Sequence, residues 1–143
     1  MRSWHDFHLI GYSVDGKRQS LTFELEWPYE SESDIRHAKV QFCGVECYFL
    51  EHDLDSNIIY AIEETSLQEH LEASTEFFET ECKWGWPRFW RPKPYPIRPT
   101  AVELAEAIDS LTSKNVRCFQ LSSSYGLSGW VLATSIQHMQ IEA

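Results

Sequence analysis

The cysteine and histidine residues are the first candidates for chemistry in this sequence, because thiolates and imidazoles bind metal ions and act as nucleophiles or bases. Cys43 and Cys47 are separated by three residues, and the other two cysteines stand alone. Structural zinc sites usually need two paired Cys-x-x-Cys motifs, which are missing here. His5 and His8 point to opposite faces if residues 4–8 already form a strand. We therefore predict no metal site and no cofactor.

Hydrolytic and phosphate-binding motifs do not emerge either. The segment Gly126-Leu127-Ser128-Gly129 lacks the G-x-S-x-G pattern of a nucleophile elbow, and it fits a glycine-rich hairpin loop. Neither a Walker motif nor G-x-G-x-x-G occurs. Carboxylate pairs such as Glu63-Glu64 are too plentiful to single out an acid–base couple. We predict no catalytic residues and expect that the protein is not an enzyme.

The distribution of charge is the strongest functional signal. The chain has 22 acidic and 12 basic residues, for a net charge of -10. Between Lys39 and Lys83 there is no lysine or arginine, and eleven of the acidic residues lie in that window. Such a face would attract a basic protein and orient it, although it could equally be a solvated face that maintains solubility. The predicted partner-binding carboxylates are Glu63, Glu64, Glu69, Glu72, Glu76 and Glu79.

The second unusual feature is an aromatic, proline-rich segment over residues 84–95. Five of the six prolines fall in residues 87–99, so this part is neither helix nor central strand. Trp and Arg dominate interface hot spots, which makes Trp84, Trp86, Arg88 and Trp90 candidate anchors. The same residues could instead pack a long loop over the sheet. Stacking on nucleic acid is disfavoured by the net negative charge.

Hydrophobic periodicity predicts an α+β fold. Alternating apolar residues indicate five successive strands at residues 7–14, 20–27, 38–42, 47–54 and 58–65, which we expect to pair as an antiparallel meander. Ser66-Leu67-Gln68-Glu69 fits a capping box at the start of a helix that continues to residue 82. A second helix begins near Thr100, with Asn115 as its left-handed C-cap.

Two more strands are expected at residues 116–122 and 129–134, and residues beyond Ser135 are expected to fray. The predicted fold is thus one α+β domain over residues 1–143, with a mostly antiparallel sheet of about seven strands and two helices. No apolar run is long enough to cross a bilayer, no signal peptide is visible, and cysteines are few. We expect a cytoplasmic protein that does not contact membranes.

The opening Trp4-His5-Asp6-Phe7-His8-Leu9 and the later Phe42-Cys43-Gly44-Val45 resemble small bacterial proteins with an N-terminal "FHD"-like box. Several such families look like immunity proteins of polymorphic toxin systems, which are compact acidic α+β proteins. The resemblance implies a toxin inhibitor that occludes a basic toxin surface and carries over no catalytic residue.

Two other classes stay open. One is a small-molecule or carbohydrate-binding module or enzyme that uses the Trp-rich loop 84–95 as a lid. The other is a structural subunit of a homo-oligomer.

Overall fold

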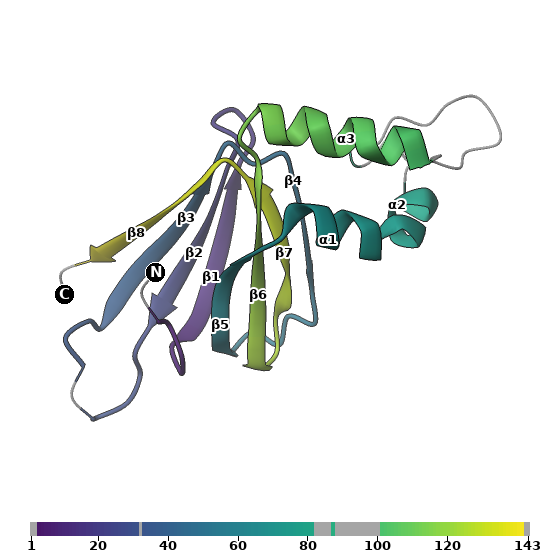
Figure 1. Cartoon of the computed structure of the whole chain (residues 1–143). Helices are drawn as coiled ribbons and strands as arrows, with labels where there is room; N and C mark the ends of the chain where they lie inside the picture. The colour runs from purple at the N-terminus through teal and green to yellow at the C-terminus, as the bar shows by residue number, and fades with distance from the viewer. Residues whose placement is uncertain (1–2, 32, 82–86, 88–100, 142–143) are drawn as a thin grey trace.

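The computed structural model describes residues 3–31, 33–81, 87 and 101–141, and within them it has eight strands and three helices (Figure 1). The predicted α+β class with a mostly antiparallel sheet is confirmed, with one strand and one helix more than expected. The strands are His8–Asp15 (β1), Ser20–Glu26 (β2), His37–Cys43 (β3), Cys47–Glu51 (β4), Asn57–Thr65 (β5), Arg117–Tyr125 (β6), Ser128–Ala133 (β7) and Ser135–Ile141 (β8). The helices are Leu67–Ala73 (α1), Thr75–Glu81 (α2) and Ala101–Ser113 (α3).

All eight strands form one antiparallel sheet in the order β4-β7-β6-β5-β1-β2-β3-β8. Only the first three strands form the expected meander, so the prediction of a five-stranded meander is wrong. The chain leaves β3 at Gly44, whose φ of 61° lies in the left-handed region. The next two amides do not form hydrogen bonds to β3: Val45 N donates to Gln19 O and Glu46 N donates to Leu132 O. The following residues therefore pair with β7 rather than fold back on β3.

The sheet curls so that its two ends approach each other. β7 is second in the sheet order and β8 is last, yet only Thr134 separates them in the chain. Both the amide and the hydroxyl of Thr134 donate to Cys43 O, each at 3.0 Å. On the other side β1 and β5 pair over two residues only, His8 with Ile58 and Leu9 with Asn57. The strands fan apart beyond these connections, as Figure 1 shows.

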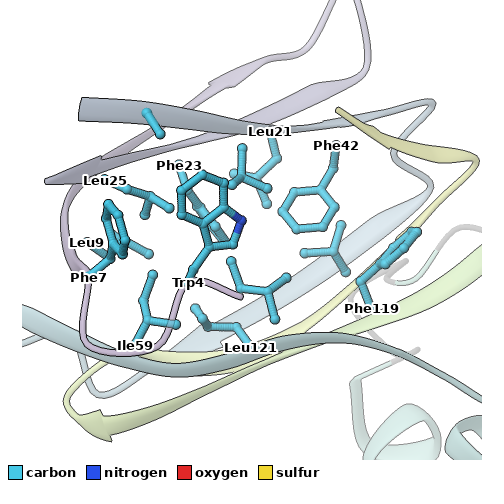
Figure 2. Packing of buried hydrophobic residues seen from close by; sticks show 14 of the residues in the cluster. Trp4, Phe7, Leu9, Leu21, Phe23, Leu25, Phe42, Ile59, Phe119 and Leu121 are labelled. Carbon is cyan, nitrogen blue, oxygen red and sulfur yellow. The ribbon is translucent and has the colours of Figure 1, made fainter. Parts of the chain in front are cut away.

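The main hydrophobic core fills the inside of this curl. It includes Leu21, Phe23 and Leu25, the apolar side of the alternating segment 20–27, and all three are at most 1% exposed. Trp4 lies among them at 2% exposure, and Figure 2 shows its indole in the middle of the cluster. Asp6 N donates to Ile59 O and Ile59 N donates to Phe7 O. These hydrogen bonds fix the segment before β1 against β5, with Trp4 inserted into the core.

A second core lies on the opposite face of β4, β7 and β6, under the helices. Leu71 of α1, Phe78 of α2 and Leu111 of α3 are fully buried there against Trp130 and other residues of the strands. Sheet residues alternate between the two cores, as Trp130 and Leu132 do with Val131 and Ala133. This part of the sheet is therefore covered on both faces.

The expected long helix is divided into α1 and α2. Ser74 has φ -102° and ψ 12°, outside regular helix geometry. Next to it, the Thr75 hydroxyl donates to Leu71 O and Glu72 O, competing with the backbone amides for these carbonyls. The strand β8 also corrects a prediction, because residues beyond Ser135 are not frayed: they pair with β3 along its full length.

Candidate functional site

Four of the six predicted partner-binding carboxylates, Glu63, Glu69, Glu72 and Glu76, are exposed on the helix-bearing side of the protein. We call them the acidic surface. On β5, Glu63 lies opposite Gln120 and Thr65 lies opposite Cys118, a member of the core under the helices. Because side chains alternate along a strand, Glu63 and Thr65 share the face that carries the helices. The other three carboxylates follow on α1 and α2.

The orientation of α1 follows from its cap and its buried residue. Ser66 Oγ accepts a hydrogen bond from Glu69 N at 3.2 Å, as the capping-box pattern predicted. Leu71 is fully buried, which fixes the inner side of the helix. Glu69 and Glu72 are three residues apart and therefore lie on one side of α1. Both are exposed, and Gln68 Nε2 donates to Glu72 Oε1 at 3.0 Å.

An aromatic cluster holds α1 and α2 on the sheet. The Trp130 ring lies 4.8 Å from the His70 ring and 5.7 Å from the Phe78 ring, measured between centroids. His70 Nε2 is buried without a hydrogen-bond partner, and burial lowers the pKa of this imidazole below its ordinary value. His70 is thus a neutral packing residue at pH 7. Glu69, Glu72 and Glu76 are therefore carried by helices that pack against the sheet.

Two acidic residues of the window without lysine or arginine form ion pairs with basic residues elsewhere in the chain. Arg117 Nη1 lies 3.4 Å from Glu64 Oε1, and Lys114 Nζ lies 3.9 Å from Glu46 Oε1. Glu64 is opposite Phe119, a residue of the main core, so it belongs to the other face of the sheet. The structure therefore separates Glu64 from the acidic surface.

For the four residues of the acidic surface, no ion pair with lysine or arginine forms within the described part of the chain. Of the six lysines and arginines there, four lie within 4.0 Å of a carboxylate outside this set. The potential of the acidic surface is therefore not cancelled by these cations.

The remaining predicted contacts divide into two groups. Glu79 lies on α2 and is half-buried. Trp84, Trp86, Arg88 and Trp90, with most of the loop 84–95, lie outside the described residues. Their role as interface anchors stays a prediction.

Tyr60 is an exposed residue of this region that sequence reasoning did not select. Its side chain is 59% exposed, and it borders an open groove of about 400 Å³ together with Trp4, Glu63 and Glu64. The His5 ring packs edge-on against Tyr60, with 5.3 Å between centroids. The strand irregularity between Ile59 and Ala61 turns Tyr60 outward. The apolar run 58–62 gave no signal for such a bulge.

Comparison of the chain with protein-family models, curated proteins and solved structures gives no match. The helices of the described residues are all too short or too polar to span a bilayer. In the same residues, no three His, Cys, Asp or Glu side chains lie close enough together to hold a metal ion.

Proposed function

We propose that this protein binds a basic protein through the acidic surface, as an immunity-type inhibitor that acts in the cytoplasm by occlusion rather than by catalysis. The observation that carries the proposal is the exposure of Glu63, Glu69, Glu72 and Glu76 on one side, without lysine or arginine partners in the described part of the chain. Glu64, which Arg117 pairs, is left out of the binding set.

The physical basis is electrostatic steering to a rigid surface. A group of negative charges on one surface raises the association rate with a cationic partner and fixes the orientation of that partner. The capped helix α1, anchored by Leu71 and by contacts to Trp130, loses little conformational entropy on binding. Tyr60 adds an amphipathic side chain at the groove beside Glu63, of the type enriched in interface hot spots.

The test is co-purification with the product of the neighbouring gene, followed by affinity measurement at low and high salt. Reversing two charges, Glu69→Lys with Glu72→Lys, should weaken binding by about tenfold or more at low salt. A matched control, Glu30→Lys with Glu51→Lys, changes the net charge equally at exposed positions outside the helices. Its effect should be at most about threefold.

Two results would argue against the proposal. One is an affinity that is independent of salt and unchanged by the α1 reversals. The other is an equal loss of affinity in both double variants, because that would reflect overall charge rather than this surface. The alternative of a small-molecule or carbohydrate site under the loop 84–95 stays a prediction, since that loop lies outside the described residues.

A further inference from the structure

Within the described residues the sheet ends in β8, an edge strand that pairs with another strand, β3, on one side only. Its sequence, Ser-Ile-Gln-His-Met-Gln-Ile, contains no lysine, arginine, aspartate, glutamate, proline or glycine. Natural proteins generally shield such edges with charges, prolines, bulges or covering segments, because unpaired strands recruit other strands. Figure 1 shows β8 as the outermost strand on its side of the sheet.

The direction of the β8 main-chain groups follows from the ladder beside it. Trp27 N donates to Arg36 O, so these two residues, which directly follow β2 and precede β3, form a hydrogen-bonded pair that extends the β2–β3 ladder. Such pairs alternate along an antiparallel ladder. The even-numbered residues of β3 therefore bond to β2 and the odd-numbered ones bond to β8. The register from His37–Ile141 to Cys43–Ser135 contains no bulge.

It follows that Ile136, His138 and Gln140 direct their N–H and C=O groups away from β3. No hydrogen bond satisfies these groups within the described residues. The strand thus offers three donors and three acceptors at the spacing of a strand, on an exposed edge.

The charge distribution decides which partner fits this edge. The strands β3 and β8 contain no aspartate or glutamate and one lysine, Lys39, although the chain carries 22 acidic residues. Two copies of this chain repel each other overall because each has a net charge of -10. The β3–β8 ribbon has no carboxylate side chain, so two copies can meet there without bringing acidic residues of these strands together. A basic partner, in contrast, gains nothing from this ribbon.

We propose that the open edge of β8 pairs antiparallel with β8 of a second copy, around a two-fold axis at His138, to give one continuous sheet. In that register Ile136 lies opposite Gln140 and His138 lies opposite itself, with about six main-chain hydrogen bonds. The contact is isologous and closed, because each copy uses the same strand. It is independent of the acidic surface and of the function proposed for it.

The expected dimer is weak. A single seven-residue strand pair falls below the roughly 1,600 Å² of a standard stable interface. Met139, 38% exposed on the outer face, adds a side-chain contact beside the new ladder. Assembly is therefore concentration-dependent, and it strengthens at high salt because salt screens the repulsion between two acidic chains. The complex with a basic protein responds to salt in the opposite direction.

The test is analytical ultracentrifugation of the full chain from about 1 µM to about 500 µM, a range suited to a weak interface, at low and high salt. The expected mass rises from 16.8 kDa toward twice that value, and rises further at high salt. Gln140→Pro removes an outward N–H but no bond to β3, so it should abolish the rise. The matched variant Gln140→Ala keeps the N–H and should dimerise like the parent.

A parent protein that stays monomeric at every concentration and salt overturns the proposal. So does a dimer that persists in a folded Gln140→Pro variant, or one that disperses at high salt. If the proline variant does not fold, amide hydrogen exchange of the parent decides the question. The amides of Ile136, His138 and Gln140 should exchange more slowly as protein concentration rises, and unchanged rates in a dimeric sample would refute this edge.

Discussion

The indole Nε1 of Trp4 donates a hydrogen bond to Nδ1 of His138 at 3.0 Å, and the two rings stack with centroids 5.7 Å apart. This contact connects the segment before β1 to the last strand of the sheet. It requires an imidazole whose Nδ1 carries no proton, so the proton of the neutral ring is on Nε2. The protonation of His138 and the packing of the main core are therefore coupled.

The first prediction concerns pH. Partial burial lowers the pKa of His138 from its ordinary value of 6.5, so the folded state favours the neutral ring. The unfolded chain then takes up a proton first as the pH falls. The stabilising contribution is fully present above pH 6.5 and is lost as the pH falls through the lower folded-state pKa.

Thermal unfolding should be measured between pH 8 and pH 5, a range that includes the ordinary histidine pKa of about 6.5. Over this range His138→Gln should lose less stability on acidification than the parent protein. Part of the pH dependence should remain, because burial also lowers the pKa of His70. His52→Gln, at an exposed loop position, is the control and should keep the parental profile. A parental profile in His138→Gln would contradict the coupling.

The second prediction concerns Asn57, which is 2% exposed. Its Oδ1 accepts hydrogen bonds from Leu54 N at 3.1 Å and Leu127 N at 2.8 Å, and its Nδ2 donates to Asp53 Oδ1. Asn57→Ala leaves two loop amides without acceptors and should lower the free energy of unfolding by about 2–4 kcal/mol. Urea denaturation measures this loss, and Ser56→Ala at the exposed neighbouring position should change it little.

The third prediction concerns two glycines. A Cβ on Gly129 would lie 1.9 Å from Phe49 O, which belongs to the backbone of the neighbouring strand and cannot move aside. Gly129→Ala should therefore destabilise the protein by about 3 kcal/mol or more. At Gly16 a Cβ meets nothing within 4 Å, so Gly16→Ala should stay within about 1 kcal/mol of the parent. Equal melting temperatures for the two variants would show that β4 and β7 are not paired in this register.

The fourth prediction concerns the cap of α1. Ser66→Ala removes the acceptor for Glu69 N and should cost about 1 kcal/mol. Ser66→Asp supplies another acceptor and should recover most of that loss. Chemical denaturation of the three proteins measures the difference. If alanine and aspartate behave alike, Ser66 does not act through its side-chain oxygen.

Local patterns in the sequence were sufficient to predict several elements of the structure. The alternation of Leu21, Phe23 and Leu25 identified a half-buried strand, and all three are in the core. The capping pattern located the start of α1 at Ser66. Asn115, expected as a left-handed C-cap, has φ 62° and is followed by a bond from Val116 N to Leu111 O. Each of these features depends on residues close together in the chain.

Features that depend on distant partners were not predictable in the same way. The inner face of β8 alternates Ile136, His138 and Gln140 with the outer residues Gln137 and Met139, so apolar and polar residues occur on both faces. The alternation of apolar and polar residues that identifies a half-buried strand is therefore weak in β8. Similarly, nothing near Trp4 shows that its partner is 134 positions away.

The sequence predicted that negative charge is concentrated in one segment of the chain, but it did not predict which of these carboxylates lie on the same surface. The window without lysine or arginine contains exposed carboxylates on β5, α1 and α2. It did not show that Arg117, far along the chain, pairs with Glu64, or that Glu63 and Glu64 lie on opposite faces. Alternation within a strand separates neighbours in sequence, and only strand pairing reveals which of them share a face.

The interleaved order of the strands has a consequence for biosynthesis. β4 gains its partner only when β7 exists, β5 is completed by β6, and β3 is completed by β8. Loops that close such distant pairs slow folding, because their entropy is lost before the contacts form. A nascent chain that ends before residue 117 would expose three incomplete strands on the ribosome. Stable folding is therefore expected only after the final strand has emerged, and until then protection by chaperones would be most valuable.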